Sequence, residues 1–164
     1  MTRIVLASAG GAAALLFGLG CSAATNCAPG TAEPVDAIRH MYEGAMAGDR
    51  AKTLANFDTE AFMFDGGARF TPDGIMDVII KSEAAGMKPV WTVEGVESHV
   101  SCDLAWAAWT NHATFTTTAG STPKTYLESA VFVWRDGSWK VRFFHSTLVP
   151  AGGTQPNQAN SVTK

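Results

Sequence analysis

Basic residues are few and scattered in this sequence. Twelve Lys and Arg stand against fifteen Asp and Glu, which gives a formal net charge of −3, and no segment gathers several Lys or Arg together. Nucleic acid is therefore not expected as a partner, because its binding depends on clustered positive charge. At 164 residues the chain has room for one domain and no length for a second.

Familiar catalytic and metal-binding motifs are also missing. The sequence has no Gly-x-Ser-x-Gly, no glycine-rich phosphate loop and no metalloprotease helix. It has no Cys-x-x-Cys, and its few cysteines and histidines do not cluster with the spacing of a zinc site. We therefore expect neither a metal nor a cofactor.

The first 24 residues are typical of a secretory signal peptide. One arginine precedes a run of apolar and small residues, and cleavage after Ala24 fits the small-x-small rule through Ser22. A transmembrane helix is the alternative, and Gly and Ala dilute the run that it would need. The segment Gly18-Leu19-Gly20-Cys21 also resembles a lipoprotein signal, although that pattern normally begins with Leu. We expect an exported protein, periplasmic or secreted, with lipid anchoring at Cys21 left open.

Export changes the interpretation of the two remaining cysteines. Cys27 and Cys102 would lie in an oxidising compartment, where disulfides persist. A disulfide between them and two free thiols both remain open.

The order of predicted elements indicates an α+β domain over residues 34–150, after a linker at 25–33. Apolar residues recur at helical spacing from Val35 to Met46, a short helix follows Asp49, and a third helix follows the N-cap Thr71. One strand is expected within 60–67, and four long strands at 89–100, 103–118, 124–135 and 138–149. Helices first and an antiparallel meander afterwards are typical of α+β folds. Residues 151–164 are polar and predict a disordered tail.

The last two predicted strands place an acid opposite a histidine. Asp136-Gly137 is a strong signal for a two-residue hairpin turn, because a type I′ turn needs positive φ at both central positions. An uninterrupted ladder from that turn pairs residues whose numbers sum to 273. Glu128 then faces His145, on the same side of the sheet as Phe132 and Phe143.

Several segments together resemble a known superfamily. The segments are "AGDRAKTLANF" after the first helix, a phenylalanine-rich strand, a helix containing "GI", and the ending "VFVWRDGSWKVRFFHST". They resemble the SnoaL-like, nuclear transport factor 2-like superfamily, and the ending is similar to small bacterial members of unknown function and to the association domain of calcium/calmodulin-dependent protein kinase. The resemblance covers residues 34–150. It implies a cone-shaped, curved antiparallel sheet wrapped around a long N-terminal helix, with a pocket at the wide end and often a homodimer.

Glu128 and His145 are the candidate catalytic residues. They can act as a general acid/base pair in an apolar cavity, or simply satisfy each other as a buried cross-strand pair. If a loop at 119–121 sets the preceding register, His112 joins Glu128; a slip of one residue brings Asn111 and Trp109 there instead. The candidate ligand contacts are Tyr42, Asp65, Trp91, His112, Phe132 and Phe143.

Three functions follow from this interpretation. The first is an exported pocket protein that binds a small, mostly apolar molecule, and the second is a lyase or isomerase that uses His145 with Glu128. The third is a dimerising assembly domain without catalysis. A cavity of ~300 Å³ or more that touches Glu128 and His145 would favour the first two, and a filled cone with an apolar outer face would favour the third.

Overall fold

The computed structural model describes residues 27–28 and 31–152. The predicted signal peptide, Cys21 and residues 153–164 of the predicted tail lie outside these ranges. Within the described part, no helix is long and apolar enough to cross a membrane.

Three helices occupy the first half of the described chain. α1 (Val35–Met46) buries the predicted apolar stripe as far as Ala45 and leaves Met46 exposed. α2 (Arg50–Leu54) begins where the Asp49 side chain accepts a hydrogen bond from the Lys52 amide. α3 (Pro72–Ala84) begins at Thr71, whose hydroxyl accepts from the Gly74 amide. Both caps are confirmed, because each supplies an acceptor to an amide that has no partner within its own helix.

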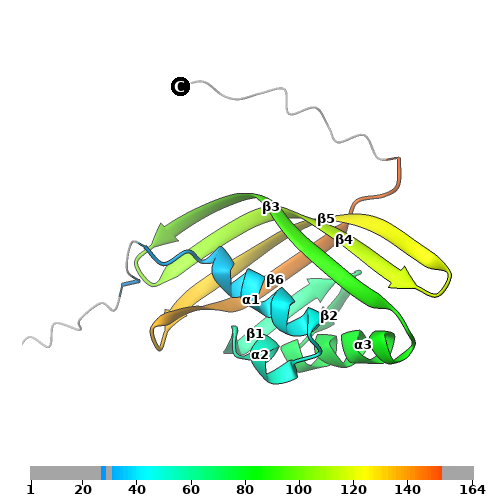
Figure 1. Ribbon diagram of the computed structural model, residues 1–164. Coiled ribbons are helices and arrows are strands. Elements are labelled where there is room, and N and C mark those ends of the chain that lie inside the picture. The colour runs from blue at the N-terminus through cyan, green and yellow to red at the C-terminus, as the bar shows by residue number, and fades with distance from the viewer. Residues whose placement is uncertain (1–26, 29–30, 153–164) are drawn as a thin grey trace, which may run out of the picture.

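The sheet has six strands in the order β2-β1-β6-β5-β4-β3. They are β1 (Phe57–Asp65), β2 (Ala68–Phe70), β3 (Lys88–Ser101), β4 (Leu104–Thr117), β5 (Gly120–Arg135) and β6 (Ser138–Leu148). β1 runs parallel to β6, and all other neighbours are antiparallel. The sheet arches over α1, while α2 and α3 lie on the same concave side (Figure 1). The predicted α+β class and the curved sheet around an N-terminal helix are confirmed, with one parallel pair that was not expected.

The core lies between α1 and the concave face of the sheet. Ile38 of α1, Phe132 of β5 and Val141 of β6 are all 0% exposed. Alternation along the strands sends these side chains inward and the intervening ones to the convex face. The same alternation determines which polar residues point toward the helices.

The Asp136-Gly137 turn is confirmed, with φ of 52° and 76° at the two residues. Near the turn the ladder also follows the prediction: Trp134 faces Trp139, and Phe132 faces Val141.

Beyond Val141 the predicted register is wrong, because a β-bulge interrupts β6. Phe132 and Val131 are consecutive, yet their partners are Val141 and Phe143, so Arg142 is an additional residue in β6. An extra residue shifts all later pairs by one and moves their side chains to the other face. Glu128 consequently faces Ser146.

The β4–β5 hairpin takes neither of the two registers considered, because Trp109 faces Glu128, although the second register assigned Asn111 and Trp109 to the correct face of the sheet. Thr117 pairs with Gly120, so the turn lies at 118–119 and not at 119–121. Pro123 is tolerated inside β5 because β6 ends at Leu148, opposite Tyr126, and leaves that part of β5 with a free edge.

A disulfide joins Cys27 to Cys102. The neighbouring Ala28 amide donates to the Cys102 carbonyl at 3.1 Å. Of the two states left open, the bonded one is present, and it fastens the segment before α1 to the turn between β3 and β4.

Candidate functional site

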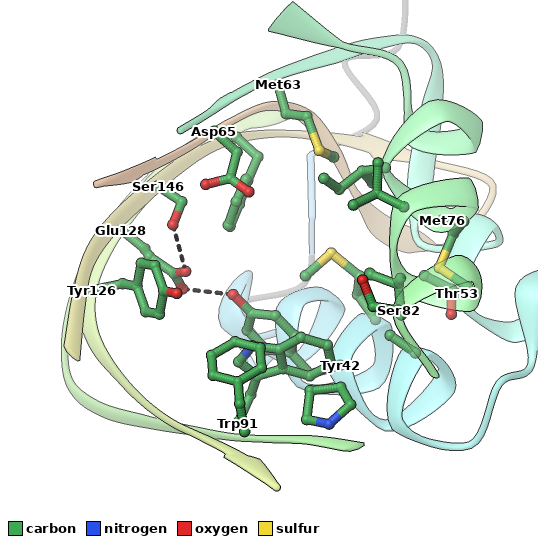
Figure 2. Close-up of a pocket in the computed structure, with 18 of the residues that line it drawn as sticks. Tyr42, Thr53, Met63, Asp65, Met76, Ser82, Trp91, Tyr126, Glu128 and Ser146 are labelled. Atoms are coloured by element: carbon green, nitrogen blue, oxygen red, sulfur yellow. Dashed lines mark hydrogen bonds between the residues drawn. The ribbon is translucent and has the colours of Figure 1, made fainter. Parts of the chain in front are cut away.

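A cavity of about 190 Å³ lies between α1, α3 and the concave face of the sheet (Figure 2). Most of its wall is apolar and rich in methionine and aromatic rings, including Met41, Met63, Met76, Met87, Trp91 and Phe144. Its polar groups include Tyr42, Asp65, Tyr126, Glu128 and Ser146. The cavity is smaller than the ~300 Å³ that the sequence argument set for a ligand pocket, and it touches Glu128 but not His145.

Glu128 lies at one side of this cavity and is only 5% exposed. The Tyr42 hydroxyl donates to its Oε2 at 2.6 Å, and Trp109 Nε1 donates to the same oxygen at 2.7 Å. Its Oε1 accepts from Asn111 Nδ2 at 3.1 Å and from Ser146 Oγ at 3.0 Å. A carboxylate accepts about four hydrogen bonds, so this one is fully used by the protein itself.

The strand ladder explains how these partners converge. Ser146 of β6 pairs with Asp65 of β1 on one side and with Glu128 of β5 on the other, and Glu128 pairs with Trp109 of β4. These four residues form one row across four strands, with side chains on the concave face. Tyr42 reaches the row from the buried stripe of α1 (Figure 2).

Asn111 lies two residues after Trp109 in β4, projects to the same face of the sheet and is 0% exposed. Its Nδ2 donates to the Tyr42 oxygen at 3.0 Å as well as to Glu128. The amide nitrogen must face the carboxylate, because a carboxylate accepts hydrogen bonds and cannot donate one. Asn111 Oδ1 therefore points away, and it is buried without a partner among the described residues.

Burial shifts the titration of both central groups. Desolvation raises the pKa of Glu128 above its ordinary value, and its four hydrogen bonds oppose that shift without cancelling it. Desolvation and the nearby charge of Glu128 raise the pKa of Tyr42 well above its ordinary value. Tyr42 therefore keeps its proton, and its hydroxyl group donates a hydrogen bond to Glu128.

Asp65 ends β1, points toward the same part of the cavity, and is half-buried (Figure 2). Burial raises its pKa, while a backbone hydrogen bond from Gly66 and the charge of His145 oppose the shift. Among the described residues its carboxyl has no side-chain hydrogen-bond partner. Asp65 is thus the carboxyl group of this cavity that remains free to meet a ligand.

The structure separates the predicted site residues into two groups. Tyr42, Asp65, Trp91 and Glu128 line the cavity. Phe132 lies deeper in the core, at 0% exposure, and does not line it.

His112, Phe143 and His145 lie on the convex face, so the prediction that they share a face with Glu128 is wrong. His145 pairs with Ser129 and is exposed, with its ring near Phe64 at 6.5 Å and its Nε2 3.2 Å from Thr147 Oγ1. Phe143 belongs to the same outer aromatic cluster, because the bulge at Arg142 turns it outward.

His112 pairs with Thr125 and lies 3.6 Å from Glu94 through its Nε2. The outward position follows from the hairpin turn at 118–119, which reverses the face that the first register assigned to it.

The sequence argument missed three residues of the site or left them as an alternative. Asn111 and Trp109 were the alternative to His112, and the structure selects them. Ser146 was not considered, because an uninterrupted ladder assigns its place opposite Glu128 to His145. Among the described residues, no group of three or more His, Cys, Asp or Glu is arranged to hold a metal ion.

Comparison with known proteins gives similarities in structure alone. No family model matches the chain, and no curated protein matches it in sequence. A protein of unknown function from Mycobacterium tuberculosis is 13% identical, covers 77% of each chain and superposes with a TM-score of 0.63. A proposed calcium/calmodulin-dependent protein kinase II association domain from Xanthomonas campestris is 18% identical, with 75% of this chain and 92% of that chain covered and a TM-score of 0.61.

A proposed dehydratase of the nuclear transport factor 2-like family from Streptomyces avermitilis is also similar. It is 14% identical and superposes with a TM-score of 0.61 over 69% of this chain and 91% of that chain. At such low identities the likeness establishes architecture and not chemistry. With its curved, open sheet arched over α1 and its cavity on the concave side, the chain has the nuclear transport factor 2-like fold.

Proposed function

We propose that this chain is an exported protein that binds one small, mostly apolar molecule in the cavity beneath its sheet. The observation that carries the proposal is Asp65, a half-buried carboxyl group that faces the cavity and has no side-chain partner within the described part of the chain. A buried polar group that serves only the fold is normally paired, as Glu128 is. A carboxyl group that lies at a cavity wall and lacks a side-chain partner suits a ligand.

The wall of the cavity supports an apolar body for that ligand. Flexible methionines and flat aromatic rings fill irregular space well and adapt to different shapes. The volume of about 190 Å³ suits a molecule smaller than the drug-sized ligands of cavities of ~300–1,000 Å³.

The disulfide supports export. Cys27–Cys102 requires an environment in which thiols oxidise and stay oxidised, and such bonds are rare in the cytosol. This agrees with the signal-peptide pattern of residues 1–24, which lies outside the described residues. Mass spectrometry of the protein secreted by its native host would detect cleavage after Ala24.

Binding is tested with two neutral probes, 2-phenylethanol and acetophenone, by saturation-transfer NMR and calorimetry. Both probes should bind the wild type. Ser82→Phe should remove binding because Ser82 lines the cavity, whereas Lys81→Phe adds the same ring at the exposed neighbouring position and should not. Absence of binding to the wild type, or equal binding to both variants, would contradict the proposal.

A second candidate function is proton transfer by Asp65. Its raised pKa and free carboxyl group suit a general base in an apolar site, and the solved neighbours include a proposed dehydratase and a proposed ketosteroid isomerase. The base would be Asp65 and not the Glu128–His145 pair, whose members lie on opposite faces. Wild type should accelerate exchange of the methyl protons of acetophenone for deuterium, and Asp65→Asn should not. Equal exchange rates in the two proteins would contradict proton transfer and leave ligand binding as the proposed function.

The convex face supports a third proposal, a homodimer. Leu104, Trp106 and Leu127 are each about half exposed on this face, at 50%, 47% and 48%. Exposed large apolar side chains on one face of a sheet suit a protein interface, and the structural neighbours include kinase association domains. Sedimentation should show a dimer that Trp106→Lys converts to monomer and that the peripheral Thr122→Lys leaves intact. A wild-type monomer would contradict it.

A further inference from the structure

The charges that line the cavity are all of one sign. Two carboxyl groups, Asp65 and Glu128, belong to the wall, and no Lys, Arg or His does so among the described residues. Negative charges in a partly desolvated space favour a cation and repel an anion, because low polarity strengthens both effects. A carboxylate or phosphate ligand is therefore a poor fit to this cavity.

The hydrogen-bonding groups at the polar end are mainly acceptors. The hydroxyl groups of Tyr42 and Ser146 both donate to Glu128, and the Tyr42 oxygen also accepts from Asn111 Nδ2, so each hydroxyl oxygen can offer a ligand an acceptor site but no donor. Among the described residues, the Asp65 carboxyl group has no side-chain donor, so its oxygens are acceptors available to a ligand. The hydroxyl of Tyr126 is the donor that remains near them (Figure 2). A ligand that complements this end must bring hydrogen-bond donors of its own.

Aromatic rings line the same cavity. Trp91 stacks on Tyr42 with ring centroids 5.1 Å apart and meets Phe115 edge-on at 6.5 Å. Aromatic faces attract ammonium groups within about 6 Å, and tryptophan does so most strongly. Phe115 already shows this attraction, because Lys124 Nζ lies 5.2 Å from its centroid.

Two basic side chains lie just outside the cavity, and neither reverses the negative charge of its lining. Lys124 is exposed and contacts Phe115 without lining the space. His145 influences Asp65 from the convex face, where it is exposed to water. Water screens both charges, whereas the two carboxyl groups are at least half-buried.

We propose that the ligand of this cavity is a small protonated amine, with its ammonium group between Asp65 and the Tyr42 oxygen and its apolar body against the methionines and Trp91. This inference rests on the proposed binding function and adds the chemical class of the ligand to it. An ammonium group supplies three donors and one positive charge, which are the two things that the polar end lacks.

The volume limits the size of that amine. A dry cavity of about 150 Å³ holds a benzene molecule, so a cavity of about 190 Å³ accommodates one ring with a short arm. A single aromatic ring carrying a two-carbon ammonium chain is of this size.

Three probes of nearly equal shape test the inference: 2-phenylethylamine, 2-phenylethanol and 3-phenylpropionate, each titrated calorimetrically at pH 7. The amine should bind roughly 10-fold more tightly than the alcohol, and the carboxylate more weakly than both. Asp65→Asn should bring the amine to the affinity of the alcohol and change the affinity for the alcohol by less than about 3-fold. Glu97→Gln removes one exposed negative charge outside the cavity and should alter neither affinity.

The outcomes separate this inference from the function on which it rests. If the alcohol binds as tightly as the amine, or the carboxylate binds best, the amine assignment is wrong while the ligand pocket stands. Binding of none of the three probes overturns both. An unchanged preference for the amine in Asp65→Asn, with its melting curve still cooperative, also overturns the assignment.

Discussion

Replacement of Tyr42 by phenylalanine measures how strongly the Glu128 network holds the fold together. The substitution removes one hydroxyl group, the donor to Glu128 Oε2 at 2.6 Å and the acceptor for Asn111 Nδ2 at 3.0 Å. A hydrogen bond to a charged group contributes about 1.5–3 kcal/mol, and Phe keeps the ring packed against Trp91. We expect the free energy of unfolding at pH 7 to fall by about 1.5–3 kcal/mol, or roughly 6–12 °C in Tm for a domain of this size.

The loss should depend on pH in a direction that the structure determines. The Tyr42 hydroxyl favours the ionised form of Glu128, so its removal raises the pKa of Glu128 further above the already raised wild-type value. When folding raises the pKa of a carboxyl group, the folded protein loses stability as the pH rises from the pKa of the unfolded state, ordinarily 4.5, through the pKa of the folded state. The difference between Tyr42→Phe and wild type should therefore be small near pH 3 and grow toward pH 7.

Urea denaturation followed by circular dichroism, with the disulfide intact, measures this difference across the pH range. Tyr126→Phe is the matched control, because Tyr126 also lines the cavity but its hydroxyl has no hydrogen-bond partner among the described residues. It should change stability by less than about 0.5 kcal/mol. Equal losses in the two variants, or a Tyr42→Phe loss that is constant from pH 3 to 7, would refute the charged network.

Three further predictions concern other groups. Asp65→Asn should raise stability at pH 7 and leave it unchanged near pH 3 in urea titrations, since burial raises the pKa of Asp65 from 3.8 and ionisation therefore destabilises the fold; a loss at pH 7 would contradict this. The double variant Cys27→Ser, Cys102→Ser should lose roughly 2–4 kcal/mol in the same assay, because the disulfide spans a separation of 75 residues. His145→Ala should change stability by less than about 0.5 kcal/mol and leave calorimetric binding of 2-phenylethanol unchanged, since the side chain is exposed on the convex face.

Local signals in the sequence were sufficient for most of the fold. Thr71 and Asp49 predicted two helix starts because capping depends on residues three apart, and Asp136-Gly137 predicted a turn because few residues adopt positive φ. Tyr42 lay on the apolar stripe of the first helix and Asp65 at a strand end, so each was placed near the cavity by its own element. None of these predictions depended on pairing across long distances.

Register was the quantity that local signals could not supply. From the turn at Asp136-Gly137 the ladder is predictable only while it is regular, and the bulge at Arg142 ends that regularity after four pairs. Arg142 forms ion pairs with Asp58 and Glu60 of β1, the strand on the other side of β6. The change of register therefore accompanies a contact with a strand about eighty residues earlier in the sequence. The sequence of the hairpin alone does not predict that contact.

The shift exchanges one kind of partner for another, and this changes which group can do chemistry. Opposite His145, Glu128 would have belonged to a pair that titrates near neutral pH. Opposite Ser146, and with Tyr42 and Trp109 beside it, Glu128 is instead a buried acceptor whose hydrogen bonds are all supplied by the protein. Its remaining influence on a ligand is its negative charge. Among the described residues, Asp65 lies in the same row without a side-chain partner and is then the carboxyl group able to form a direct contact. Proton transfer and amine selectivity are therefore both tested at that position.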